Sequence, residues 1–175
     1  MTTLHICSPD LADAEQLLEF ECANRAHFEQ WVQARDPAYY SIEAVRRAIQ
    51  DAQADRDKDV AYQYLVKMGN GSIVGRVNFT AVVRPYFNKA VIGYRMAQGV
   101  SGRGYASQAV GLALQEAFGA LDLWRVEAVA RPENAGSIRV LERNGFVQYG
   151  LAKRSMLFHG VRYDLAHFER HAQPA

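Results

Sequence analysis

A glycine-rich loop at residues 101–107, Ser-Gly-Arg-Gly-Tyr-Ala-Ser, is the segment of this chain best suited to binding a phosphorylated ligand. It connects a predicted strand to a predicted long helix. Small residues let the backbone approach a ligand closely, and the first turn of a helix offers unpaired N–H groups and positive potential at the same position. A pyrophosphate is therefore the favoured ligand, with Ser107 as a further hydroxyl donor. The alternative is a strand-to-helix connection that binds nothing.

Two nucleotide-binding motifs are excluded. A P-loop requires GxxxxGK followed by Ser or Thr, and the chain has no such run. The dinucleotide fingerprint GxGxxG would require a third glycine where Ser107 stands. The acidic residue expected about 20 positions later is also poorly placed.

Asn134 and Ser137 form a second polar pair, at the start of a predicted short helix over residues 134–144. Taken alone, Asn134 is an ordinary N-cap and Ser137 an ordinary polar residue of the first turn. Their spacing of one helical turn lets both side chains face the same side. Because this helix follows the strand beside the glycine-loop unit, its N-terminus is predicted to face the same cleft as the loop.

Hydrophobic periodicity predicts the elements that position these residues. The N-terminal half begins with a strand at residues 3–7. Ser8-Pro9-Asp10 predicts a helix start, with Ser8 as the N-cap. The predicted apolar face of that helix consists of Leu11, Ala14, Leu18 and Cys22. Ser41 is predicted to cap a second helix, whose apolar face consists of Ile42, Val45, Ile49 and Ala52.

From residue 60 the periodicity becomes that of strands. Two strands flank the turn Gly69-Asn70-Gly71, and a third covers residues 90–96. The predicted buried stripe of the long helix is Val110, Leu114, Ala117 and Leu121. A strand at residues 124–130, the short helix ended by Gly145, and a hairpin at His159-Gly160 complete the chain. The order β-α-α-β-β-β-α-β-α-β-β predicts a mixed α/β sheet, mostly antiparallel, with helices on both faces.

Composition narrows the class of protein. The 175 residues suit a single domain, predicted to span residues 1–175. The net charge of +1 and the lack of a long basic run argue against direct nucleic-acid binding. The N-terminus lacks the pattern of a signal peptide, and no apolar stretch approaches the ~20 residues that span a bilayer. We therefore expect a cytoplasmic protein with no membrane partner.

The two cysteines, Cys7 and Cys22, lack the spacing of a metal site, and no metal is expected. We interpret them as small buried hydrophobes or unreactive thiols. Whether the protein is a monomer or a homodimer is left open by the sequence.

In their order along the chain, these motifs resemble the GNAT acetyltransferases. The resemblance rests on residues 92–96, Ile-Gly-Tyr-Arg-Met, on the loop at 101–106, and on Asn134-x-x-Ser137 followed by Leu-Glu-Arg-Asn-Gly-Phe at 141–146. It covers nearly the whole chain, and the pattern is similar to the RimJ/RimL type, whose best-known members acetylate N-terminal amines of ribosomal proteins. The resemblance implies the GNAT fold and acetyl-coenzyme A (acetyl-CoA) as co-substrate.

The resemblance also implies roles for individual residues. The strand at 92–96 would separate from its neighbour and pair with the pantetheine arm, and the backbone N–H of Met96 would polarise the acetyl carbonyl. Asn134 would bind the pantetheine amide, and Ser137 would protonate the departing thiolate. Arg139 and Arg143 would approach the 3′-phosphate. The pyrophosphate would be held by Gly102, Arg103, Gly104, Tyr105, Ala106 and Ser107.

Two positions depart from the family pattern. The loop opens with Ser101 where Gln or Arg is usual, which matters little because the backbone binds the phosphates. Some RimL-like members have a Glu in the penultimate strand as general base, but this chain has Met156 there. Glu127 is a substitute candidate, and its alternative role is an ion pair with Arg125 or Arg131. The remaining candidate bases are Asp164, His159 or a relay of water molecules.

The implied reaction is direct attack of a neutral amine on the thioester, so no enzyme nucleophile is needed. An α-amino group, with a pKa near ~8 against ~10.4 for lysine, loses its proton more readily and favours a protein N-terminus as acceptor. One alternative is acetylation of a small-molecule amine or antibiotic. Another is a non-catalytic acetyl-CoA sensor, which the missing Glu keeps open. Acceptor specificity is expected in the final hairpin and near the first two helices. The helical residues concerned are aromatic and could equally belong to the core: Phe28, Trp31, Tyr39 and Tyr40.

Overall fold

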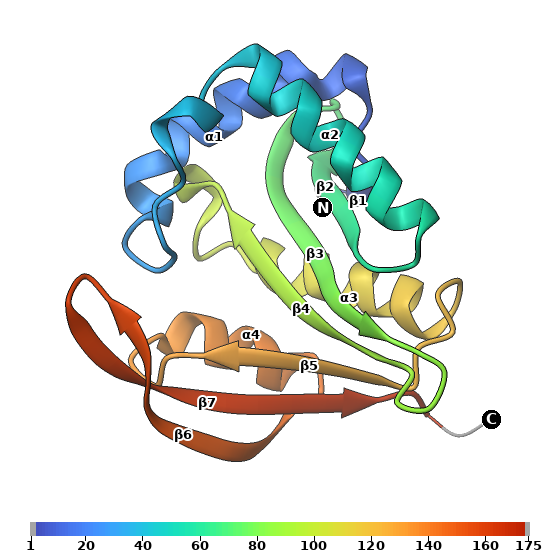
Figure 1. The fold of residues 1–175 in the computed structure, drawn as a ribbon, viewed down its shortest axis with the longest axis vertical. Coiled ribbons are helices and arrows are strands. Elements are labelled where there is room, and N and C mark those ends of the chain that lie inside the picture. The colour runs from blue at the N-terminus through green and yellow to red at the C-terminus, as the bar shows by residue number, and fades with distance from the viewer. Residues whose placement is uncertain (1–2, 174–175) are drawn as a thin grey trace.

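The computed structural model describes residues 3–173 as one twisted seven-stranded sheet with four α-helices (Figure 1). The strands lie in the order β1-β2-β3-β4-β5-β7-β6, and every neighbouring pair is antiparallel except β4 and β5. The strands are β1 (Leu4–Cys7), β2 (Tyr62–Met68), β3 (Ile73–Val83), β4 (Lys89–Met96), β5 (Arg125–Ala130), β6 (Val147–Phe158) and β7 (Val161–His171). The helices are α1 (Ala14–Phe28), α2 (Ile42–Asp57), α3 (Tyr105–Phe118) and α4 (Ala135–Arg143).

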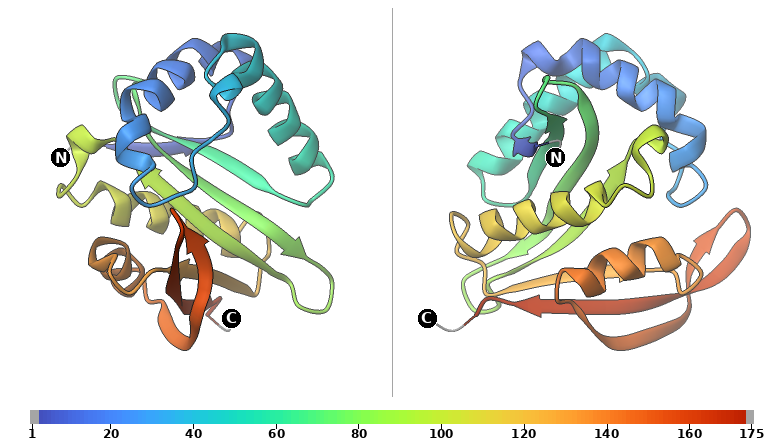
Figure 2. Two further views of the ribbon diagram at one scale, coloured as in Figure 1. Left: turned by 60° about the vertical axis from the view of Figure 1, so that its left-hand side comes forward. Right: turned by 180° about the vertical axis from the view of Figure 1, so that it is seen from behind.

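The helices cover both faces of the sheet, as Figure 2 shows. Consecutive residues of β2 point to opposite faces, because side chains alternate along a strand. Leu65 is fully buried in an apolar cluster with α1 and α2, whereas Val66 is fully buried in a larger cluster that contains the apolar stripe of α3. The predicted mixed α/β class, the mostly antiparallel sheet and the order of elements are confirmed.

The predicted start of the first helix is wrong. Asp10, not Ser8, caps the segment: its side chain accepts the N–H of Ala12, while the Asp13 carboxylate accepts the N–H of Asp10. This reciprocal capping box satisfies two backbone donors at once and opens a short 3-10 turn that leads into α1. The single hydroxyl of Ser8 has no such reciprocal partner, so it would satisfy fewer backbone N–H groups than the two carboxylates do.

The predicted buried face of α1 is also largely wrong. Ala14 is buried as expected, but Leu11 and Cys22 are exposed and Leu18 is half-buried. The face against the sheet instead includes Leu17, Phe20 and Phe28, together with the polar residues Glu21 and Asn24. The hydrophobic periodicity did not predict this face of α1 because two of its residues, Glu21 and Asn24, are polar.

Later predictions agree closely with the structure. Ser41 caps α2 and accepts the N–H of Ala44, and Val45, Ile49 and Ala52 are buried. Gly145 has a positive φ of 74° immediately after α4, and the last hairpin turns at His159-Gly160. One detail differs: Leu121 lies beyond the end of α3, so it belongs to the following turn rather than to the helical stripe.

The separation of β4 from β5 creates the space for a site. The two strands pair over three positions, from Lys89 opposite Arg125 to Val91 opposite Glu127. Beyond that point β4 continues beside β3 and β5 continues beside β7, and Figure 1 shows the two strands diverging. The edge of β4 from Ile92 to Met96 therefore faces an opening and not a neighbouring strand.

Candidate active site

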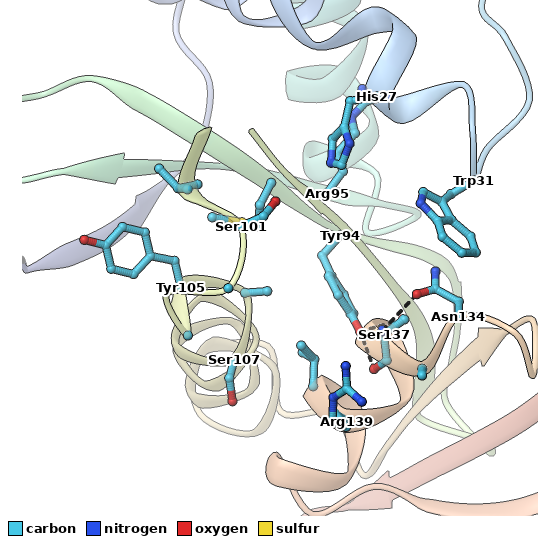
Figure 3. Close-up of a pocket in the computed structure, with 18 of the residues that line it drawn as sticks. His27, Trp31, Tyr94, Arg95, Ser101, Tyr105, Ser107, Asn134, Ser137 and Arg139 are labelled. Atoms are coloured by element: carbon cyan, nitrogen blue, oxygen red, sulfur yellow. Dashed lines mark hydrogen bonds between the residues drawn. The ribbon is translucent and has the colours of Figure 1, made fainter. Parts of the chain in front are cut away.

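A cavity of about 680 Å³ occupies the opening between the diverging strands. Four parts of the chain line it: the end of α1 and the loop after it, the end of β4, the glycine-rich loop with the first turn of α3, and the start of α4. In Figure 3, His27, Arg95 and Trp31 lie on one side of the Tyr94 ring, and Ser107 and Arg139 lie on the other. The cavity thus has two ends that differ in their residues: His27, Trp31 and Arg95 lie at one end, and Ser107 and Arg139 lie at the other.

The N-terminus of α3 forms one end. Gly104 is its N-cap, adopts the left-handed conformation with φ 79°, and has no other heavy atom within 4 Å of where a Cβ would stand. No side chain caps this helix, and its first intrahelical hydrogen bond is donated by Gln108 to the Gly104 carbonyl. The N–H groups of the first turn are therefore left for a ligand, as a phosphate group requires.

Ser107 is prepared as a hydrogen-bond donor. The Asn144 amide donates to Ser107 Oγ and to the Ser107 carbonyl, each at 3.1 Å. The same amide nitrogen lies 2.8 Å from the Val140 carbonyl oxygen, and because a hydroxyl both accepts and donates, Ser107 Oγ can donate its own hydrogen to a ligand in the cavity. Asn144 lies at the end of α4, so this contact also fixes α4 against α3.

The start of α4 brings Asn134 and Ser137 to the cavity together, as their spacing predicted. Asn134 Oδ1 accepts the backbone N–H of Ser137 at 3.0 Å, so Asn134 is the N-cap of the helix. Within residues 3–173, the amide nitrogen of Asn134 makes no hydrogen bond and can donate to a ligand carbonyl.

Ser137 has a partner that the sequence analysis did not assign. The Tyr94 hydroxyl lies 2.8 Å from Ser137 Oγ and 3.1 Å from the Ser137 carbonyl oxygen. Burial raises the pKa of Tyr94 to about 12, although the hydrogen bond to Ser137 opposes the shift. Tyr94 therefore keeps its proton at neutral pH and can act as a donor.

The backbone N–H of Met96 points into the opening. The Ala97 N–H donates to the Val74 carbonyl at 2.8 Å, so Ala97 belongs to a hydrogen-bonded pair of the β3–β4 ladder. Such pairs recur at every second residue of an antiparallel ladder. The backbone groups of Arg95 consequently face β3, and those of Tyr94 and Met96 face the cavity.

The remaining predicted cofactor-binding residues are placed as follows. Gly102, Tyr105 and Ala106 line the cavity, and so do Arg139 and Arg143 of α4. Arg103, although part of the same loop, is exposed and is not among the lining residues. The structure therefore brings together every predicted cofactor-binding residue except Arg103.

The candidate bases lie elsewhere. Glu127 is paired with Lys89 at 3.1 Å and with Arg125 at 2.8 Å, which is the alternative role that the sequence allowed. Asp164 accepts the backbone N–H of Arg154, and His159 lies 3.4 Å from the Glu29 carbonyl. Neither these three residues nor Met156 lines the cavity.

Several lining residues were missed by sequence reasoning. His27, Arg95 and Glu133 contribute titratable groups, and Phe28 and Trp31 line the cavity as the aromatic prediction allowed. Tyr39 and Tyr40 lie outside it and stack with Arg35 and Arg25, respectively. The only available signal was the helical spacing of Asn24, His27, Phe28 and Trp31 on one side of α1 and its extension.

Arg131 lies behind the end of the cavity that contains His27, Trp31 and Arg95, which we call the acceptor end, and contacts the lining residue Trp31. Its guanidinium carbon lies 4.8 Å from the ring centre of Trp31 and 4.7 Å from those of Phe158 and Tyr163. Its Nη2 also donates to the Gln30 carbonyl at 2.9 Å. One buried cation therefore holds the loop after α1 against the β6–β7 hairpin.

Neither cysteine lines the cavity. Both are unpaired thiols; burial raises the pKa of Cys7, and Cys22 is exposed, contrary to the predicted burial. In the described part of the chain no three His, Cys, Asp or Glu side chains gather as metal ligands would. None of the helices within residues 3–173 has the length and apolarity needed to cross a membrane.

Comparison with known proteins identifies the family. A family model described as acetyltransferase (GNAT) domain matches residues 4–147. The probable N-acetyltransferase YjcK of Bacillus subtilis (strain 168) is 33% identical over 163 residues, which cover 93% of this chain and 90% of that protein. The chain belongs to the GNAT acetyltransferase family and is an acetyl-CoA-dependent N-acetyltransferase.

Two further similarities concern the RimJ/RimL type. The ribosomal protein uS5 alanine N-acetyltransferase of Escherichia coli (strain K12) is 28% identical over 149 residues, covering 85% of this chain and 77% of that protein. The structure of Mycobacterium smegmatis RimJ in complex with CoA-disulfide has a TM-score of 0.89 and 26% identity, covering 97% of this chain and 82% of that one. The family resemblance predicted from the motifs is thereby confirmed.

Proposed function

We propose that this enzyme acetylates the N-terminal α-amino group of a protein by direct attack on acetyl-CoA in a ternary complex. The observation that carries the proposal is the two-ended cavity at the separation of β4 and β5, with the Met96 N–H directed into it. The similarity to the uS5 alanine N-acetyltransferase, which by its name acts on a ribosomal protein, supports a protein acceptor.

The residues at the α3 end fit coenzyme A. Open space at Gly104 and the uncapped first turn of α3 suit the pyrophosphate. Arg139 and Arg143 are available for the 3′-phosphate, and the Asn134 amide for a carbonyl of the pantetheine arm. The exposed edge of β4 would pair with that arm as a neighbouring strand does.

When bound, acetyl-CoA supplies an activated acetyl group as a thioester. The Met96 N–H donates a hydrogen bond to the carbonyl oxygen, on which negative charge develops as the amine nitrogen forms its bond to the carbonyl carbon. The C–S bond then breaks, and the Ser137 hydroxyl gives its hydrogen to the departing sulfur; the proton that the acetylated amine releases returns through water to the serine oxygen. Tyr94 Oη lies 2.8 Å from Ser137 Oγ, and when the tyrosine is the donor of this hydrogen bond the serine hydrogen is free to point toward the sulfur. No cysteine takes part, because both thiols lie outside the cavity.

The acceptor amine must be neutral to attack. An α-amino group with a pKa near ~8 is partly neutral at physiological pH, so a strong dedicated base is not required. His27 and Glu133 are the lining residues that can receive the proton released after attack, directly or through water. A lysine side chain, with a pKa near ~10.4, would be a much poorer acceptor at the same pH.

We also propose that the reaction takes place in the cytoplasm. The two unpaired thiols suit a reducing compartment.

Thiol release from acetyl-CoA tests the proposal. The free thiol should appear only when an amine is added, and peptides with a free N-terminus should be better acceptors than polyamines or aminoglycosides. Binding of acetyl-CoA without thiol release in any of these mixtures would identify a sensor and contradict the proposal. Faster thiol release with a small amine than with every peptide tested would also contradict the proposal.

A further inference from the structure

Glu21 is a buried carboxylate surrounded by more positive charge than it can neutralise. Its side chain is 1% exposed, and its Oε1 lies 2.7 Å from Arg76 Nη1 and 2.6 Å from Arg95 Nη2. Arg35 Nε lies 4.0 Å from Oε2. None of the three arginines forms an ion pair with another carboxylate in the part of the chain that the structure describes. One negative charge is thus shared by three cations.

Two of these arginines are occupied or turned away from the cavity. Arg76 is 5% exposed, and its terminal nitrogens also donate to Gln63 and Tyr39. Arg35 lies with its guanidinium 4.1 Å from the ring centre of Tyr39 and does not line the cavity. Of the three cations, Arg95 is therefore the one that can meet an anionic ligand in the cavity.

Arg95 is the member of the cluster that reaches the active site. It lines the cavity on the same side as His27 and Trp31, away from Ser107 and Arg139 (Figure 3). Its side chain is 18% exposed, and within residues 3–173 only its Nη2 makes a hydrogen bond. Burial lowers the pKa of Arg95 to about 10, which leaves the group cationic at neutral pH. An anionic ligand would remove part of the cost of burying it.

Arg95 is also the residue immediately before Met96, whose N–H faces the acetyl position. A ligand that enters from the α1 side therefore meets a guanidinium carried by the residue next to the proposed hydrogen-bond donor for the acetyl carbonyl. The guanidinium is planar and can bind both oxygens of a carboxylate. The end of the cavity opposite the phosphate-binding loop is thus an anion site as well as an amine site.

We propose that the acceptor carries a carboxylate close to its amine and that Arg95 binds this carboxylate while the amine faces the acetyl group. The inference rests on the acetyl transfer in the proposed function and names the class of acceptor; a free amino acid as the acceptor would keep the role of Arg95 and contradict a protein N-terminus. The carboxylate has two sources: an Asp or Glu side chain at the second or third residue of a protein N-terminus, or the α-carboxylate of a free amino acid.

Paired acceptors provide the test. One pair consists of peptides that differ only by Asp or Asn at the second residue; the other consists of a free amino acid and its amide. The wild-type kcat/KM should favour the acidic member of one pair by about tenfold to a hundredfold, the range of a hydrogen bond to a charged group. The pair that shows the preference identifies the source of the carboxylate.

Variants assign the preference to Arg95. Arg95→Gln should bring the acidic and neutral acceptors to similar kcat/KM while leaving the KM for acetyl-CoA unchanged, and Arg95→Lys should retain part of the preference. Arg35→Gln is the matched control, because it removes a positive charge from the same cluster outside the cavity and should keep the preference.

The outcomes separate this inference from the proposed function. Equal kcat/KM for acidic and neutral acceptors in the wild-type enzyme would overturn the role of Arg95 and leave N-terminal acetylation standing; this comparison needs no variant to fold. An unchanged preference in a folded Arg95→Gln enzyme would overturn it as well. Failure to acetylate any peptide would instead remove the proposed function.

Discussion

The hydroxyl of Tyr94, on the diverging strand β4, lies 2.8 Å from Oγ of Ser137, on the first turn of α4. This contact joins two walls of the cavity at the position where the thiol is proposed to leave. It also means that the serine does not act alone, because the orientation of its hydrogen depends on what the tyrosine donates.

Ser137→Ala should lower kcat by about tenfold to a thousandfold, because it removes the proton donor of the C–S cleavage step. The dissociation constant of acetyl-CoA should hardly change, since this interaction strengthens only in the transition state. Steady-state kinetics with a good peptide acceptor and calorimetry with coenzyme A measure the two quantities. A variant with the wild-type kcat would show that Ser137 only supports the helix.

The role of Tyr94 can be separated from its packing. Tyr94→Phe removes the hydroxyl and keeps the ring, so kcat should fall by a smaller factor than in Ser137→Ala. The double variant should be about as slow as Ser137→Ala, because the tyrosine acts through the serine. Multiplicative losses in the double variant would show that the two hydroxyls act independently.

The pH dependence should follow the acceptor and not the tyrosine. The kcat/KM for a peptide acceptor should rise with pH up to the amine pKa near ~8. It should then stay level to about pH 9, because Tyr94, with a pKa of about 12, and Arg95, with a pKa of about 10, are still protonated there. Rate measurements over this range check the profile. A fall in kcat/KM between pH 8 and 10 that is absent in Tyr94→Phe would contradict the raised pKa.

Gly104→Val should weaken coenzyme A binding strongly. The branched side chain would stand in the space where the pyrophosphate is proposed to lie, and the residue has a φ of 79°. Gly160→Val is the matched control, because Gly160 has a φ of 77° and equally open surroundings in the β6–β7 hairpin. Calorimetry should show a loss of affinity only for Gly104→Val. Equal affinity in both folded variants would remove the loop from the cofactor site.

Arg131→Met should destabilise the acceptor end. The change removes a cation from three aromatic rings and a hydrogen bond to the Gln30 carbonyl, and we expect a loss of about 2 kcal/mol in the free energy of unfolding. The KM for the acceptor should rise while that for acetyl-CoA stays constant. Arg131→Lys, which keeps the charge, should be intermediate. If Arg131→Met left both the free energy of unfolding and the KM for the acceptor unchanged, the contacts of Arg131 would contribute neither to stability nor to acceptor binding.

The fold and the cofactor end of the site follow from local sequence signals. The glycine loop before α3, the Asn134 cap and the Gly145 turn after α4 are each specified by a few neighbouring residues, so the prediction of their positions in the fold was confirmed. The prediction of Ser8 as the first cap failed because two neighbouring carboxylates, Asp10 and Asp13, formed a reciprocal cap.

The acceptor end could not be predicted in this way. Glu21 is polar, and its burial is explained only by Arg76 and Arg95, which are 55 and 74 positions away in the chain. The contact of Arg131 with Trp31 likewise joins distant segments. Local periodicity places such residues on the solvent face, because it contains no information about the partners that a fold brings to them.

The site of acetylation on one peptide tests the proposed function most directly. A peptide with a free N-terminus and an internal lysine is incubated with acetyl-CoA and enzyme, and tandem mass spectrometry then locates the acetyl group. We predict a single acetyl group on the α-amino nitrogen, formed only in the presence of enzyme. An acetyl group on the lysine side chain, or an unmodified peptide under conditions where a small amine is acetylated, would contradict N-terminal acetylation.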